Sequence, residues 1–168
     1  MKNLILIIVL TFTTCITVFG QNYIYKGDKQ FEATESWQFE LNGDYWTGNP
    51  EFAVAKHTNG GYLMISIPVP FKQHFISGTV TIFLIDGYVI KCTDKGIRDH
   101  VDNKSIALYN FTKKEIEMLK QKRITRIRFT VGDETFTADN KVSAYHKLLK
   151  NKNKNYYETD IEVSELFK

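Results

Sequence analysis

The stretch TVTIFLIDGYVIKCT, residues 79–93, gives the clearest indication of the fold. Two apolar runs flank Asp86-Gly87, and this dipeptide between such runs is the strongest short-range signal for a tight β-hairpin. Residues 82–85 are apolar, and no polar residue alternates among them. Such a strand is typical of a sheet that is covered on both faces. We therefore predict a hairpin whose first arm is a central, buried strand.

Further strands are predicted on both sides of this hairpin. Residues 37–41 alternate apolar and polar side chains, which is typical of a half-buried strand. Residues 52–56 and 62–67 flank an Asn-Gly turn and predict a second hairpin. Residues 126–131 alternate again and run through Gly-Asp into residues 135–138, which predicts an antiparallel pair with one face in the core.

One helix is specified by its own N-terminus. Thr112 and Glu115 have the spacing of a capping box, in which each side chain accepts a hydrogen bond from the other residue's backbone N–H. Phe111 and Ile116 can pack together around it as a hydrophobic staple. We therefore predict a helix at about 112–122 within a mainly β (α+β) fold of antiparallel, sandwich-like sheets.

Residues 1–20 have the organisation of a cleavable signal peptide. Lys2 precedes an unbroken aliphatic run, and a small-residue exit stands before Gln21. We predict cleavage before Gln21 and export, to the periplasm or as a secreted protein. A membrane anchor is one alternative, although threonines dilute the second half of the segment. A lipoprotein modified at Cys15 is another, although the residues before Cys15 lack the usual lead-in.

The rest of the chain has the size of one ordinary domain. We predict a single β-rich domain at 21–140 and a basic tail at 141–168, of which residues 156–167 could dock as a last strand or a turn of helix. The formal net charge is +3, so no global field attracts nucleic acid. After signal cleavage Cys92 is the only cysteine, so no internal disulfide is available, and we predict no membrane span.

Cys92 is a candidate nucleophile. It could form a Cys-His pair with one of the four histidines, and the catalytic candidates are Cys92, His100 and Asp99. The opposing interpretation is structural, because Cys92 is in phase with Tyr88 and Ile90 on a hairpin arm and would be a small buried hydrophobe. The sequence contains no motif of a recognised enzyme class.

Three nearby carboxylates are candidate metal ligands. Asp94, Asp99 and Asp102 could offer oxygens to Ca²⁺, but their spacing differs from that of an EF-hand loop. A Zn²⁺ site would need a second nearby His or Cys, which is missing. The simpler interpretation is an irregular loop in which Arg98 pairs with Asp99 or Asp102. We therefore predict no metal and no cofactor.

Two sets of residues are candidates for binding. Tyr45 and Trp46 are adjacent aromatics near Gly48, where rings can stack on a sugar or grip a partner; alternatively they straddle a strand. Basic residues of the predicted helix could form a patch for an anionic glycan or a lipid head group, or simply solvate the helix. These residues are Lys113, Lys114, Lys120 and Lys122.

Several motifs follow one another in a recognisable order. A Cys-Thr-Asp-x-Gly-Ile-Arg-Asp stretch at 92–99, the short helix and an Ile-x-x-Ile-Arg-Phe strand at 124–129 come after the 79–93 hairpin. Over about residues 78–131 the chain thereby resembles a group of uncharacterised small exported bacterial proteins. The resemblance implies a shared fold and carries no activity.

These observations favour one class of function. We expect a secreted or periplasmic, non-catalytic binding module of the cell envelope, whose partner is an envelope protein, an anionic glycan or a lipid head group. Nucleic acid is not expected as a partner. The alternative is a small hydrolase with its site around residues 92–102.

Overall fold

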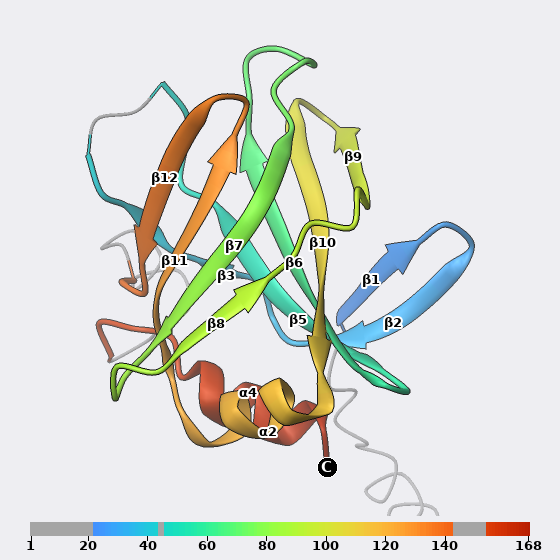
Figure 1. The fold of residues 1–168 in the computed structure, drawn as a ribbon, viewed down its shortest axis with the longest axis vertical. Coiled ribbons are helices and arrows are strands. Elements are labelled where there is room, and N and C mark those ends of the chain that lie inside the picture. Colours follow the sequence, from blue (N-terminus) through green and yellow to red (C-terminus); the bar gives the residue numbers. More distant parts are fainter. Residues whose placement is uncertain (1–21, 44–45, 143–153) are drawn as a thin grey trace, which may run out of the picture.

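A computed structural model of the chain describes residues 22–43, 46–142 and 154–168 (Figure 1). Most of the described chain forms two antiparallel sheets, so the predicted mainly β, sandwich-like fold is confirmed. Sheet A has the order β1 (Asn22–Lys26), β2 (Lys29–Ala33), β5 (Glu51–His57), β6 (Gly60–Pro68), β10 (Lys104–Thr112) and β9 (Arg98–Val101), and β3 (Trp37–Gln38) also pairs with β5. Sheet B has the order β4 (Glu40–Leu41), β12 (Glu134–Asp139), β11 (Ile124–Val131), β7 (Ile76–Leu84) and β8 (Val89–Cys92).

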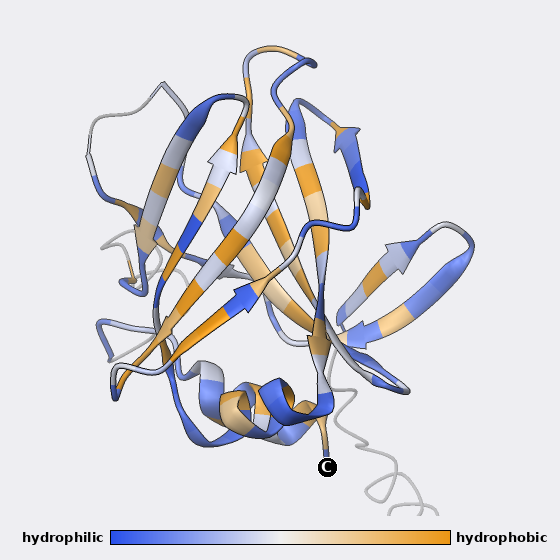
Figure 2. Cartoon of the chain, viewed as in Figure 1, coloured by the Kyte–Doolittle hydropathy of each residue, from blue (hydrophilic) through white to orange (hydrophobic). Residues whose placement is uncertain are grey.

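The core lies between the two sheets. Figure 2 shows apolar residues alternating with polar ones along strands such as β11, as expected when one face is buried and the other is wet. Phe52 of sheet A meets Phe129 of sheet B edge-on, with ring centroids 5.9 Å apart. Phe129 in turn stacks on Phe136, at 5.8 Å. All three side chains are fully buried.

Residues 37–41 differ from the predicted single half-buried strand. β3 pairs with β5 in sheet A, whereas β4 pairs with β12 in sheet B. Phe39 stands between the two strands and is completely buried. The chain therefore crosses from one sheet to the other at Phe39, which turns a corner of the sandwich.

The predicted hairpin at 79–93 is confirmed as β7 and β8. Gly87 has a φ of +83°, and the Leu84 N–H donates to the Tyr88 carbonyl at 2.9 Å. The prediction that the first arm is covered on both faces is wrong. Ile85 lies beyond the strand and is 55% exposed, and Phe83 is only partly covered, with the Arg128 guanidinium 5.6 Å from its ring centroid. β7 lies between β11 and β8 in sheet B, but within the described residues no second layer covers its outer face.

The second hairpin is also confirmed, with its turn one step earlier than the Asn-Gly pair suggested. The turn is Thr58-Asn59, and Gly60 already pairs with His57. Gly60 has a φ of +141°, and a Cβ there would lie 2.0 Å from the Phe111 carbonyl oxygen. A Cβ on Gly61 would lie 2.7 Å from the Ile116 side chain. The two glycines therefore let β10 and the following helix approach the hairpin closely.

Helices α2 (Lys113–Gln121) and α4 (Thr159–Leu166) pack together at one end of the sandwich (Figure 1). The predicted capping box is confirmed, because Glu115 N–H donates to Thr112 Oγ1 at 3.3 Å and Thr112 N–H donates to the Glu115 carboxylate at 2.7 Å. The C-terminal segment docks as a helix, and Trp37 Nε1 donates to Glu162 at 2.7 Å.

Two further points concern the predicted tail and the membrane. Residues 143–153 of the predicted basic tail lie outside the described residues. Neither helix of the described chain has the length and apolar character needed to cross a bilayer.

Candidate functional site

The polar stretch at 94–103 is more ordered than the predicted loop. Residues Arg98–Val101 form β9, which turns into β10 through Asp102 and Asn103, whose φ values are +49° and +60°. This pair of positive φ values is typical of a tight hairpin turn, in which Asn and Asp are well tolerated. The turn escaped prediction because no glycine marks it.

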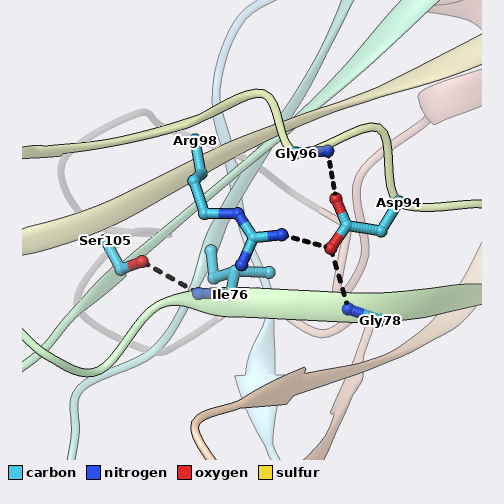
Figure 3. Close-up of polar contacts among 6 residues, drawn as sticks. All are labelled: Ile76, Gly78, Asp94, Gly96, Arg98 and Ser105. Atoms are coloured by element: carbon cyan, nitrogen blue, oxygen red, sulfur yellow. Dashed lines mark hydrogen bonds and ion pairs between the residues drawn. The ribbon is translucent and has the colours of Figure 1, made fainter.

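Asp94 is the centre of a hydrogen-bonded cluster (Figure 3). Its Oδ2 accepts from Arg98 Nη2 at 2.6 Å and from the Gly78 N–H of β7 at 3.0 Å, and its Oδ1 accepts from the Gly96 N–H at 2.6 Å. Arg98 therefore pairs with Asp94, and the predicted pairing with Asp99 or Asp102 is wrong. The cluster fastens β9 of sheet A to β7 of sheet B.

The three candidate metal ligands do not converge. Asp94 is occupied by the contacts just described, and Asp99 Oδ1 accepts from the backbone N–H of His100 at 2.7 Å. Asp102 stands in the exposed turn. Within the described residues, no three His, Cys, Asp or Glu side chains gather in a way that could hold a metal ion.

Cys92 is buried, as predicted for a structural thiol, with 2% of its surface exposed. Burial raises the pKa of the Cys92 thiol to about 12, and the Glu115 carboxylate adds to this effect. Ile90 is buried on the same face, but Tyr88 precedes β8 and is 56% exposed, so the predicted three-residue phase is wrong at Tyr88. A thiol with so high a pKa is almost entirely protonated at neutral pH and is a poor nucleophile.

His100 does not serve as a base for Cys92 in this geometry. It lies on β9 of sheet A, with its ring edge-on to Phe75 at a centroid distance of 4.5 Å, whereas Cys92 lies on β8 of sheet B. Neither ring nitrogen of His100 has a hydrogen-bond partner in the described structure. Asp99 instead bonds the His100 backbone, so the orienting contacts of a nucleophile, base and carboxylate are absent among these three residues.

Trp46 is anchored to sheet B. Its Nε1 donates to the Glu134 carboxylate at 2.8 Å, and its ring meets Phe136 edge-on at 5.8 Å. The indole remains 42% exposed and lies 5.1 Å from the His74 ring. Tyr45, the other aromatic candidate, lies outside the described residues.

The four helix lysines do not form one patch. Lys120 pairs with Glu117 at 3.0 Å. Lys122 pairs with Asp86, and its Nζ lies 3.7 Å from the Tyr88 ring centroid. This ammonium holds the pKa of the Asp86 carboxyl below its ordinary value. Of the other two lysines, Lys113 lines a pocket. Lys114 is exposed and does not line that pocket.

That pocket has a volume of about 470 Å³ and lies between the β5–β6 turn and α2. We call it the hairpin–helix pocket. Its apolar wall comes from β2, α2 and the residue after α4, and its polar rim comes from β5 and α2. The wall is Phe31, Ile116 and Phe167, and the rim is Lys56, His57, Lys113 and Glu117.

The rim carries an excess of positive charge. The Glu117 carboxylate is already paired with Lys120, and no described carboxylate lies within ion-pair distance of Lys113. Lys56 Nζ donates to a main-chain oxygen of Lys168, the last residue of the sequence, at 3.4 Å, and lies 6.0 Å from the Phe167 ring centroid. Two ammonium groups thus border an apolar wall, and within the described residues no side-chain carboxylate forms an ion pair with either of them.

Sequence reasoning identified only Lys113 of this pocket. The β5–β6 turn and the helix start were both predicted, but their proximity depends on the Gly60 and Gly61 contacts. Phe31 and Phe167 come from opposite ends of the chain, so no local pattern joins them. No family model, curated protein or solved structure matches this chain, and the interpretation of the pocket therefore stands on its geometry.

Proposed function

We propose that this protein is an exported, non-catalytic binding module of the cell envelope, and that its hairpin–helix pocket binds a lipid with an anionic head group. The observation that supports this most is a pair of ammonium groups, Lys56 and Lys113, that lie beside an apolar wall and that no described side-chain carboxylate pairs with. A phosphate can contact both cations, while an alkyl chain covers Phe31 and Phe167. An anionic glycan would satisfy the charges but would cover less of the apolar wall than an alkyl chain does.

Two further features support binding rather than catalysis at this position. The first turn of α2 borders the pocket, and the positive end of a helix dipole favours an anion. His57 Nδ1 accepts a hydrogen bond from the Asn59 N–H at 3.3 Å, so Nε2 carries the proton of the neutral ring and can donate to a ligand. Export is supported by the signal-like segment at 1–20, and N-terminal mass spectrometry should find Gln21 as the first residue.

The test is a binding titration of the mature protein with dodecyl phosphate below its micelle-forming concentration. Replacing Lys56 and Lys113 together by Gln should weaken binding about tenfold or more. A contact to an ionised group contributes about 1.5–3 kcal/mol, and the solvent and salt around this exposed rim reduce that contribution. Lys114→Gln is the matched control, since it removes the same charge from the same helix outside the pocket. Its affinity should stay within about threefold of the wild type.

Two ligand controls separate the contributions. Ethyl phosphate retains the anion without the tail, and dodecylphosphocholine retains the tail with a neutralised head; both should bind more weakly than dodecyl phosphate. Added salt should also weaken dodecyl phosphate binding. Equal affinity of the double variant and the wild type would refute the proposal, and tight binding of a sulfated oligosaccharide without dodecyl phosphate binding would reassign the pocket to glycan.

A further inference from the structure

A second hollow lies on the outer face of sheet A, apart from the hairpin–helix pocket. It has a volume of about 420 Å³ and runs between β1 and strands β6, β9 and β10. We call it the β1-edge groove. In Figure 1 the β1–β2 hairpin projects beside β10, with β1 on the side toward β9. The floor of the groove is apolar and includes Met64, Ile97, Ile106 and Leu108.

The Tyr25 backbone of β1 faces away from the partner strand β2 beside this groove. β1 is an end strand of sheet A, and it pairs with β2 through the register Lys26↔Lys29, Tyr25↔Gln30 and Ile24↔Phe31. Antiparallel pairs alternate between hydrogen-bonded and non-hydrogen-bonded residues, and the pair that closes a two-residue turn is hydrogen-bonded. Tyr25 is therefore in a non-hydrogen-bonded pair, so its N–H and C=O point away from β2.

The outward-pointing backbone N–H on the opposite wall of the groove already has a hydrogen-bond partner. β9 is the other end strand of sheet A, and by the same alternation its His100 N–H points outward. That N–H donates to the Asp99 carboxylate at 2.7 Å. A charged side chain on an edge strand is a common protection against strand pairing. An added strand would therefore pair with β1 rather than with β9.

We propose that the β1-edge groove binds an extended peptide segment, which adds to β1 as a further strand of sheet A. The unpaired N–H and C=O of Tyr25 supply main-chain hydrogen bonds, and the apolar floor receives alternate side chains of the peptide. β1 is five residues long, so a segment of similar length with apolar residues at every second position fits. A lipid chain would leave the backbone groups of Tyr25 without partners.

A second copy of this chain is a poorer occupant than a separate peptide. The side chain of β1 that could fill the floor is Ile24, and it is already buried against the chain's own sheet. Tyr25 points to the other face and is 65% exposed. Pairing of two β1 strands would therefore join backbones but bring no apolar side chain into the groove.

The probe is the synthetic peptide KTVTVTVTK, acetylated and amidated, titrated into the mature protein and its variants and followed by isothermal titration calorimetry. Tyr25→Pro removes the donor that faces the groove while leaving the β1–β2 hydrogen bonds, since proline is tolerated on edge strands where the N–H is unpaired. It should weaken binding at least tenfold. Tyr25→Val retains the N–H and should stay within about threefold of the wild type.

The peptide provides the matching test if Tyr25→Pro fails to fold. A version N-methylated on the alternate amides that face β1 should lose binding to the wild-type protein at least tenfold. Changing Lys56 and Lys113 to Gln should leave peptide binding intact, which keeps this test separate from that of the lipid pocket. Unchanged binding of the N-methylated peptide would overturn the proposal. So would self-association of the wild type that Tyr25→Pro abolishes, because the edge would then belong to a second copy.

Discussion

The two apolar regions of the molecule are built very differently. The main core between the sheets contains large aromatic and branched side chains, several of them completely inaccessible. The outer cluster, on the far face of sheet A, consists of Ile24, Ala33, Ala53, Ala55, Tyr62 and Leu108. A two-stranded hairpin covers it, and β2 joins β5 through a single residue pair, Ala33↔Ala55. The main core therefore holds most of the large buried side chains, whereas the outer cluster depends on a hairpin that one residue pair joins to β5.

The largest test of this comparison removes one side chain from each region. Phe129→Ala leaves a cavity between the two sheets and should lower the free energy of unfolding by about 3–5 kcal/mol. Ile24 lies under a hairpin that can move into the space left by a smaller side chain. Ile24→Ala should therefore lower the free energy of unfolding by about 2 kcal/mol or less. Urea denaturation followed by tryptophan fluorescence measures both. Equal losses would mean that the outer cluster is as important to the fold as the main core.

The Asp94 cluster tests how the sheets around the main core are joined. Asp94→Ala removes the acceptor of three hydrogen bonds, which come from the Gly78 and Gly96 amides and from the Arg98 guanidinium. We expect a loss of about 1–2 kcal/mol, because water can reach the exposed glycine amides that lose their partner. Asp99→Ala is the control and should cost less than about 0.5 kcal/mol, since Asp99 bonds only its neighbour. Urea denaturation of both variants measures the two losses, and equal losses would show that the Asp94 cluster does not stabilise the junction of the sheets.

The capped helix end provides a smaller effect. Thr112→Ala leaves a backbone donor of α2 without its acceptor and should lower the free energy of unfolding by about 0.5–2 kcal/mol. Lys114→Ala, on the exposed side of the same turn, should change it by less than about 0.5 kcal/mol. Identical denaturation midpoints for Thr112→Ala and the wild type would show that the cap does not hold the helix in solution.

Replacing Cys92 should have the smallest effect on the free energy of unfolding at neutral pH, and the size of this effect should change at alkaline pH. Cys92→Ala removes one buried group and should cost about 0.8 kcal/mol near pH 7. The folded chain raises the pKa of the thiol from 9.0 to about 12, so the stability linked to the protonated thiol is present below about pH 9 and is lost as the pH rises toward about 12. The advantage of wild type over Cys92→Ala should therefore shrink or reverse above about pH 9. Rapid maleimide labelling of the folded protein at pH 7 would contradict the burial on which this depends.

Local signals explain what could be predicted from the sequence. The Asp86-Gly87 turn and the Thr112–Glu115 cap involve residues close along the chain, so their physical chemistry is visible in the sequence alone. The partner of Asp94 on β7 is Gly78, whose backbone N–H has no recognisable pattern. Likewise, the hairpin–helix pocket and the β1-edge groove depend on how distant segments fold over sheet A. Of the residues predicted to bind a partner, only Lys113 lines the pocket and none lines the groove. Asp99 does line the groove, but it was predicted only as a catalytic or metal candidate.

The pairing of β4 with β12 determines when the sandwich can close. Leu41 pairs with Ala138, and Glu40 pairs with Asp139, so the edge of sheet B joins segments from near the two ends of the described chain. A chain that emerges from its N-terminus cannot complete this sheet until almost all of it has appeared. Topologies dominated by such distant pairings fold on a time scale of about milliseconds to seconds, far slower than helical bundles. Refolding of this protein from urea should therefore take about milliseconds to seconds, and shortening the path between these two strands by circular permutation should speed it.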